Sequence, residues 1–251
     1  MIENQIKEFA QIIQESRKIV FFGGAGVSTA SGIPDFRSAD GLFMRENNYQ
    51  YSAEEIISHS FYQQHPQIFF EYYFDHLVYP EIKPNLAHTF LKELEDQGKK
   101  VTVVTQNIDG LHQKAGSSRV LELHGSVLDN YCTQCGSYYA LDELEKDAQG
   151  IPRCSKDQAI VKPDVVLYQE MLNEDIINQS IQVISQADLM IIAGTSLNVY
   201  PAASFVHYFR GDSQVVINKT PIITSDPNAL IFQEKIENVF KAVKQFMENH
   251  V

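Results

Sequence analysis

The chain has 251 residues, of which 44% are hydrophobic and 21% are charged, enough for one large domain with or without small inserts. Its formal net charge of −12 argues against a nucleic-acid backbone or an anionic membrane as the main partner, because both need a basic face. The excess of acidic residues either serves solubility or favours basic peptide tails as partners.

Targeting signals and cysteine usage bear on the compartment. Residues 1–14 have no charged start followed by an apolar run, so no signal peptide is expected. No run of about 18 apolar residues occurs, so no membrane span is expected either. The three cysteines are odd in number and clustered, which suits a metal site or free thiols better than a disulfide framework. We therefore expect a cytoplasmic protein.

Helical and strand patterns alternate along most of the chain. In chain order they predict a helix at 2–16, a strand at 18–23, a helix at 86–97, a strand at 100–105, a helix at 175–186, strands at 189–193 and 214–217, and a helix at 233–248. Short apolar strands that alternate with helices are typical of a parallel sheet covered on both faces. The predicted fold class is α/β, with a Rossmann-like sheet.

Two regions break this alternation. Residues 39–83 are rich in aromatic side chains at helical spacing, and residues 127–163 hold all three cysteines among polar and turn residues. We interpret them as a helical insert and a zinc-ribbon-like insert that together form a smaller lobe. The Rossmann-like domain would then comprise residues 1–38, 84–126 and 164–251.

A glycine-rich turn, Gly24-Ala25-Gly26, follows the first expected strand. Glycines at this place let the backbone turn sharply and bring its N–H groups to a phosphate. The third glycine of the dinucleotide fingerprint is replaced by Thr29. From this segment alone, a phosphate-binding loop and an ordinary strand-to-helix turn both stay open.

Polar residues also follow the next expected strands, at 106–109 and 194–196. Ligands bind at the carboxyl ends of strands in an open parallel sheet. Asn107 and Asp109 could hold a carboxamide, because one supplies donors and the other accepts, although a polar turn is the alternative. His124 is a candidate general base, since an unperturbed imidazole titrates near neutral pH; a structural histidine is the alternative there.

The run at 24–38, GAGVSTASGIPDFRS, resembles the cofactor loop of the sirtuin family over its whole length. Three more segments follow in the family's order: TQNIDGLH at 105–112, HG at 124–125 and GTSLNVYPA at 194–202. Lesser matches lie at 84–88, 162–166 and 216–218. The resemblance spans roughly residues 18–220, and it implies an NAD-dependent deacylase of protein lysines that releases nicotinamide and O-acyl-ADP-ribose.

The resemblance also implies roles for individual residues. The histidine that matches His124 is the general base in sirtuins, and Asn107 would position ribose and water. NAD would be bound by Gly24, Ala25, Gly26, Asp35, Phe36, Arg37, Gln106, Asn107, Ile108, Asp109, Gly194, Thr195, Ser196 and Asn218. The acyl-lysine peptide would be bound by Val165, Val166, Leu167, Tyr168 and Val199, partly through strand addition.

Two features bear on the substrate. Relatives that prefer succinyl or malonyl groups carry a Tyr-x-x-Arg pair in the helical insert, but this chain has no arginine between Arg45 and Arg119. A neutral acyl group, acetyl by default, is therefore expected. Gln169 stands where relatives commonly have glycine or an acidic residue, in a segment that borders the expected peptide groove, so the resemblance does not establish the peptide preference.

The cysteine cluster, Cys132-x-x-Cys135 with Cys154, resembles the structural zinc knuckle of the family. The fourth position is Asp157 instead of cysteine. Aspartate is an allowed zinc ligand, although hard oxygen suits zinc less well than sulfur. Either these four residues bind zinc, or the insert has lost its metal and is held by packing.

Three other functions fit parts of the sequence. A sirtuin-like protein mono-ADP-ribosyltransferase would use the same cofactor, but Asn107 and His124 together favour deacylation. A dehydrogenase is disfavoured by the missing third glycine and by the lack of an acidic residue at the ribose-reading distance. A non-catalytic NAD-sensing module would bind without turnover. We expect acetyl-lysine proteins or peptides as partners, no nucleic acid or membrane, and a monomer.

Overall fold

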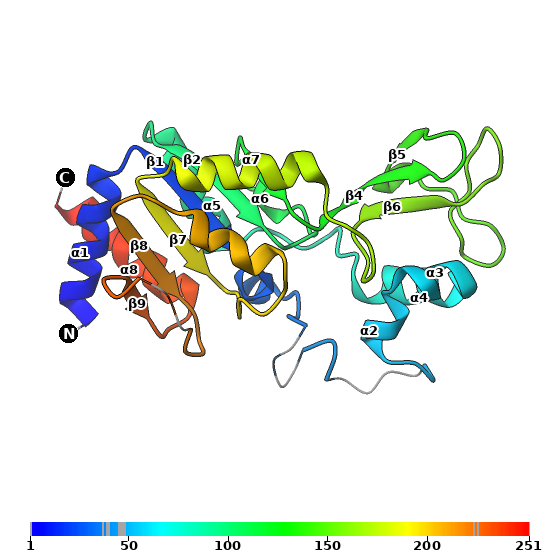
Figure 1. The fold of residues 1–251 in the computed structure, drawn as a ribbon, viewed down its shortest axis with the longest axis horizontal. Helices are drawn as coiled ribbons and strands as arrows, with labels where there is room; N and C mark the ends of the chain where they lie inside the picture. Colours follow the sequence, from blue (N-terminus) through cyan, green and yellow to red (C-terminus); the bar gives the residue numbers. More distant parts are fainter. Residues whose placement is uncertain are drawn as a thin grey trace.

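The computed structural model describes residues 2–36, 38, 41–44, 49–222, 224 and 226–250. Within these residues, parallel strands form a six-stranded main sheet in the order β3-β2-β1-β7-β8-β9 (Figure 1). The strands are β1 Lys18–Gly23, β2 Lys100–Thr105, β3 Val120–Glu122, β7 Leu189–Ala193, β8 Ser213–Ile217 and β9 Leu230–Phe232. This is the strand order of the Rossmann fold, whose connections reverse direction beside the first strand.

Helices cover both faces of the main sheet (Figure 1). The covering elements are α1 Ile2–Glu15, α5 Leu86–Asp96 and α8 Ile236–Asn249 on one face, and α7 Glu174–Ser185 with the 3-10 segment Ala202–Tyr208 on the other. Successive strand residues point to opposite faces, so Phe21 packs into the first core cluster and Phe22 into the second. Because both faces are covered, β1 is apolar and buried at every position after Lys18 instead of alternating.

A smaller lobe lies at one end of the sheet (Figure 1). It contains the helices α2 Ala53–Ile56, α3 His59–Gln64 and α4 Pro66–His76, and an antiparallel sheet of β5 Tyr138–Ala140, β4 Gly125–Cys132 and β6 Val161–Val165. Phe69 and Tyr73 of α4 share one buried cluster with Val127 of β4 and Val165 of β6. The helical and cysteine-containing parts of the lobe therefore pack on each other.

The predicted fold class is confirmed, and all four predicted strands and four predicted helices are present within a few residues of the expected bounds. The sequence did not predict β3 and β9, which are strands of three residues each. The last helix begins at Ile236 and not at residue 233. The boundaries of the domain and its inserts stay predictions. No helix of the described residues is long and apolar enough to cross a membrane.

Candidate active site

A cleft of about 1190 Å³ lies at the carboxyl ends of the main-sheet strands, beside the smaller lobe. Arg37 lies outside the described residues. All other residues that the sequence suggested for cofactor, peptide or catalysis line this one cleft: Gly24, Ala25, Gly26, Asp35, Phe36, Gln106, Asn107, Ile108, Asp109, His124, Val165, Val166, Leu167, Tyr168, Gly194, Thr195, Ser196, Val199 and Asn218. Segments more than a hundred residues apart thus meet at one place.

The loops after β1 and β7 touch through glycines. The Gly26 N–H donates to the Gly194 carbonyl oxygen at 2.8 Å. Gly194 has a φ of +60°, and a Cβ built on it would lie 2.5 Å from the Val27 nitrogen. A Cβ on Gly26 would lie 2.8 Å from the Gly194 Cα. Only glycine fits this contact, so the wall of the cleft there is bare backbone, as a phosphate-binding loop requires.

Three polar side chains join the loop after β1 to the loop after β2. The Ser28 hydroxyl donates to Asp109 Oδ2 at 2.6 Å, and Asn107 Nδ2 donates to the same hydroxyl at 3.1 Å. Asp109 Oδ1 accepts from the Leu111 N–H at 2.9 Å, which fixes the carboxylate at the start of α6 (Leu111–Lys114). Sequence reasoning missed the buried Ser28 as a site residue, although it lies inside the matched glycine run.

His124 directly precedes β4 and lines the cleft, and one of its ring nitrogens is hydrogen-bonded to the protein. Its Nδ1 lies 2.9 Å from the Gln106 carbonyl oxygen. A carbonyl only accepts, so Nδ1 carries the proton and Nε2 keeps its lone pair. Burial lowers the pKa of His124 below its usual 6.5, and the bond to Gln106 only partly offsets this effect. His124 is therefore a neutral imidazole at pH 7, in the form that accepts a proton.

Apolar and aromatic side chains form the other wall of the cleft. The rings of Phe36 and Phe43 lie 5.3 Å apart, and those of Phe43 and Tyr168 lie 6.5 Å apart. His76 and Tyr79, at the end of α4 and after it, also line the cleft. No sequence pattern pointed to these two residues, because the aromatic spacing of α4 is equally that of a buried helix. This wall can exclude water from a reacting group.

The four predicted metal ligands converge away from the cleft. The potential ligand atoms of Cys132, Cys135, Cys154 and Asp157 all lie within 4.8 Å of one another. Cys135 Sγ is 3.6 Å from Cys154 Sγ, and Cys132 Sγ is 3.3 Å from Asp157 Oδ1. A tetrahedral zinc with bonds of about 2.3 Å to sulfur places two thiolates about 3.8 Å apart, so the set fits zinc. Because β4 runs from Gly125 to Cys132, the group lies roughly 20 Å from His124.

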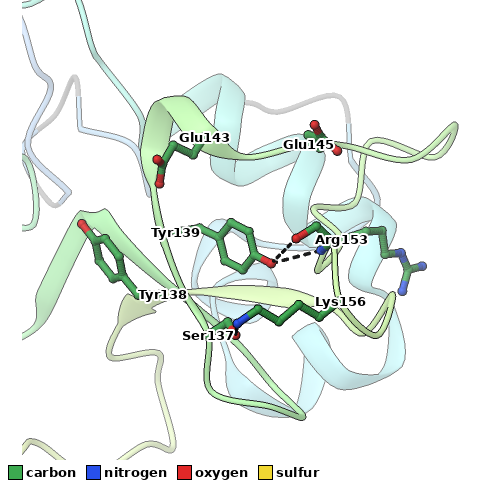
Figure 2. Close-up of a pocket in the computed structure, with 8 residues that line it drawn as sticks. Ser137, Tyr138, Tyr139, Glu143, Glu145, Arg153 and Lys156 are labelled. Atoms are coloured by element: carbon green, nitrogen blue, oxygen red, sulfur yellow. Dashed lines mark hydrogen bonds between the residues drawn. The ribbon is translucent and has the colours of Figure 1, made fainter.

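A second cavity, of about 320 Å³, lies on the cysteine-containing insert (Figure 2). Tyr139 stands at its centre, and its hydroxyl donates to Cys154 Sγ at 3.2 Å. The same oxygen accepts from the Ser155 N–H at 3.0 Å. A donor to a thiolate is what an outer partner of a metal ligand provides, so this cavity borders the metal group and not the cleft.

Comparisons with known proteins agree with this geometry. The Sir2 family model matches residues 24–201. A protein of Clostridium acetobutylicum named NAD-dependent protein deacetylase is 47% identical, covering 97% of this chain and 99% of that protein. A protein of Clostridium perfringens with the same name is 49% identical, covering 96% of this chain and 99% of that protein. A Sir2 structure with a p53 peptide and NAD+ has a TM-score of 0.81 at 34% identity, covering 98% of each chain. A Sir2 bound to acetylated peptide has a TM-score of 0.81 at 33% identity and the same coverage.

Proposed function

The chain belongs to the Sir2 family, and we propose that the cleft described above is its active site. The protein is an NAD-dependent protein deacetylase that acts on acetylated lysine. The observation that carries the site assignment is the neutral His124, whose Nε2 is free of the bond to Gln106, in the same cleft as the glycine contact. A base, a bare-backbone loop and an apolar wall are the parts that this reaction needs.

The cleft suits NAD. The Gly26–Gly194 contact would let the pyrophosphate approach the backbone, with Ala25, Thr195, Ser196 and Asn218 along the dinucleotide. Ile108 and Asp109 would hold the carboxamide, and Ser28 keeps that carboxylate oriented. When bound, NAD supplies the ribose that accepts the acetyl group. Asp35 and Arg37 are proposed to order the loop around it.

His124 is proposed to take a proton at Nε2 from a ribose hydroxyl. The bond from Nδ1 to the Gln106 carbonyl stabilises the protonated ring that forms, because the donor stays in place when charge develops. Asn107 is proposed to position ribose and water. Its Nδ2 is bonded to Ser28, which fixes the side-chain amide at the edge of the cleft that Asn107 lines.

The substrate peptide is proposed to lie between two backbone edges. One edge is residues 165–168, where the Val166 N–H donates to the His124 carbonyl at 2.9 Å and so places the edge beside the base. The other edge contains Val199, across the cleft. A peptide between them would bind by strand addition, with its acetyl-lysine directed along the apolar wall at Phe36 and Phe43.

Mass spectrometry of an acetyl-lysine peptide incubated with the purified protein tests the function. Loss of the acetyl group only when NAD is present is the expected result. An intact acetyl group together with ADP-ribose attached to protein would replace deacetylation by mono-ADP-ribosyl transfer. Formation of NADH would instead indicate a dehydrogenase.

The deacetylation rate is expected to fall as the pH drops, with a midpoint below 6.5. The neutral ring is the active form, and the pKa of His124 is lowered by burial, so protonation at Nε2 sets in only at more acidic pH. The measurement is kcat/KM for the peptide against pH, because this ratio reports the pKa of the base in the enzyme before the peptide binds. A midpoint above 6.5 would contradict the assignment of the buried His124 as the base.

The cysteine group is proposed to hold one structural zinc ion. The purified protein is expected to contain equimolar zinc by elemental mass spectrometry, and Cys154→Ala to lose it and melt at a lower temperature. Asp157→Cys is expected to retain zinc at higher chelator concentrations than the wild type, because sulfur suits zinc better than oxygen. Metal-free wild-type protein with the same melting temperature as Cys154→Ala would exclude a structural metal.

Several predictions of the sequence stay predictions here. These are the cytoplasmic location, the monomeric state, the absence of nucleic-acid and membrane partners, and the preference for acetyl over acidic acyl groups. Comparing acetyl and succinyl peptides in the same assay tests the preference for acetyl over acidic acyl groups.

A further inference from the structure

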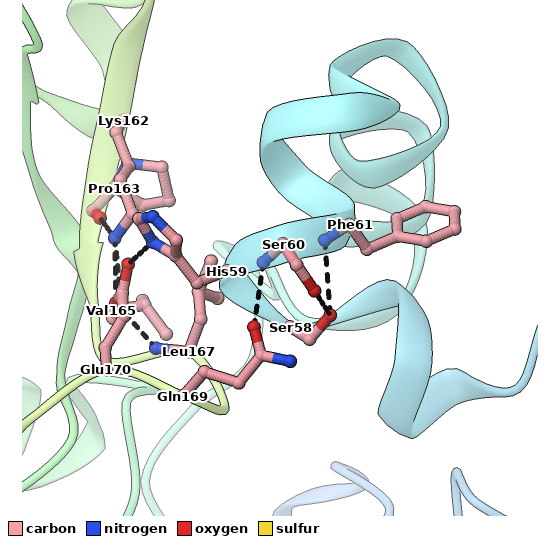
Figure 3. A network of polar contacts seen from close by, with 10 residues as sticks. All are labelled: Ser58, His59, Ser60, Phe61, Lys162, Pro163, Val165, Leu167, Gln169 and Glu170. Atoms are coloured by element: carbon pink, nitrogen blue, oxygen red, sulfur yellow. Dashed lines mark hydrogen bonds and ion pairs between the residues drawn. The ribbon is translucent and has the colours of Figure 1, made fainter.

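The loop at 166–170 is fastened to two parts of the molecule (Figure 3). At one end, Val166 is bonded to the backbone of His124. At the other, the Tyr168 N–H donates to the Ile57 carbonyl at 3.1 Å, and the His59 N–H donates to the Tyr168 carbonyl at 3.0 Å. The loop thus connects the proposed base to the helical insert, and its position depends on both.

Glu170 fastens the loop with three side-chain contacts (Figure 3). Its Oε2 accepts from the Leu167 N–H at 2.8 Å and from Lys162 Nζ at 3.2 Å, while Oε1 lies 2.8 Å from His59 Nδ1. Burial alone would raise the pKa of Glu170, but these contacts outweigh burial and lower it. The carboxylate is therefore charged at pH 7, and it ties the loop to both β6 and α3.

Gln169 adds a contact of a different kind. Its φ is +75°, a left-handed conformation that side chains other than glycine, asparagine and aspartate rarely adopt. Its Oε1 accepts from the Ser60 N–H of α3 at 3.0 Å (Figure 3). The backbone N–H and carbonyl of Gln169 have no hydrogen-bond partner among the described residues, and the residue lines the cleft. An exposed side chain thus holds a strained backbone whose polar groups are left unpaired beside the proposed peptide edge.

We propose that Gln169 and Glu170 are positioning residues for the substrate peptide. They hold the loop against the helical insert so that its unpaired backbone groups are available to the acetyl-lysine segment. This inference rests on the proposed function, because it concerns the same peptide edge. Among the described residues, the hydrogen-bond partners of both side chains lie in β6, α3 and the loop itself and not in the glycine loops, so both should affect peptide binding and leave the binding of NAD unchanged.

Substitutions at Gln169 separate the effect of its amide from that of its backbone. Gln169→Glu keeps an acceptor oxygen at the same distance along the side chain. Gln169→Asn tolerates the left-handed conformation better but is one methylene too short to reach Ser60, and Gln169→Gly removes the strain together with the contact. Glu170→Gln removes the charge that pairs with Lys162. Gln63→Asn, at an exposed position of α3 outside the cleft, is the matched control.

The experiment measures the Kd of a fluorescent acetyl-lysine peptide by anisotropy, and KM and kcat for the same peptide. We expect Gln169→Asn, Gln169→Gly and Glu170→Gln to raise Kd and KM for peptide by about three- to tenfold, the effect of one lost hydrogen bond, with kcat and the KM for NAD unchanged. Gln169→Glu and Gln63→Asn should match the wild type.

Unchanged peptide Kd in Gln169→Gly and Glu170→Gln would overturn the inference, as would a Gln169→Glu variant as weak as Gln169→Gly. A parallel rise in the KM for NAD would also overturn it, because that result indicates a general loss of structure. Since Kd is measured without turnover, a wild type that binds the peptide but does not deacetylate it would refute the proposed function and not the role of this loop.

Discussion

Replacing His124 by alanine is expected to lower kcat for deacetylation by about 10²- to 10⁴-fold, the range for a lost general base. The ring is held by its bond to Gln106 with Nε2 unprotonated, and alanine removes this acceptor without filling the cleft. NAD affinity should be unchanged, because the glycine contact at Gly26 and Gly194 is made without His124. Steady-state kinetics with an acetyl-lysine peptide and calorimetric titration of NAD measure the two quantities.

His207→Ala is the matched control, because His207 is an exposed histidine outside the cleft. It should retain the wild-type rate. If His124→Ala kept more than about a tenth of the wild-type kcat, another group would have to be the base, since even weak general-base catalysis exceeds that factor.

Gly194→Ala is expected to weaken NAD binding strongly and to lower the free energy of unfolding by about 2 kcal/mol or more. Its φ of +60° is unfavourable for alanine, and the new Cβ would lie 2.5 Å from the Val27 nitrogen. The loops after β1 and β7 must therefore separate, which removes the backbone wall proposed for the pyrophosphate. For a chain of this size the melting temperature should fall by roughly 4–8 °C.

Gly98→Ala separates the backbone cost from the clash. Gly98 has a φ of +90°, and a Cβ built there would meet nothing within 4 Å. This variant should lose about 1 kcal/mol of stability and bind NAD like the wild type. If Gly194→Ala bound NAD as tightly as Gly98→Ala, the glycine contact would not be part of the cofactor site.

The main sheet was predictable from the sequence because its central strands are buried on both faces. β1 is apolar between Lys18 and Gly23, β7 is apolar throughout, and β2 carries a single polar residue, Thr102, between its ends; such runs stand out from helical spacing. β3 and β9 could not be predicted in this way, because a strand of three residues is too short to show a hydrophobic pattern. Their place is set by pairing with β2 and β8, which is a long-range property.

The residues of the candidate site likewise fall into those that the sequence predicts and those that only the folded structure brings together. Residues that lie in contiguous runs at strand ends, such as Asn107 and Gly194, were found through those runs. The contact of Gln169 with Ser60 joins positions 109 residues apart, and only the packing of the helical insert brings them together. Spacing alone could not decide whether Asp157 is the fourth metal ligand, because it does not show where the carboxylate points. The folded insert brings this carboxylate to Cys132.

We propose that this cleft transfers an acetyl group from lysine to NAD-derived ribose with His124 as the base. The most direct test is to quantify nicotinamide, deacetylated peptide and O-acetyl-ADP-ribose in one reaction, for the wild type and for His124→Ala. We expect equimolar amounts of the three products from the wild type and almost no deacetylated peptide from the variant. Deacetylated peptide formed without O-acetyl-ADP-ribose, or formed equally well by His124→Ala, would contradict it.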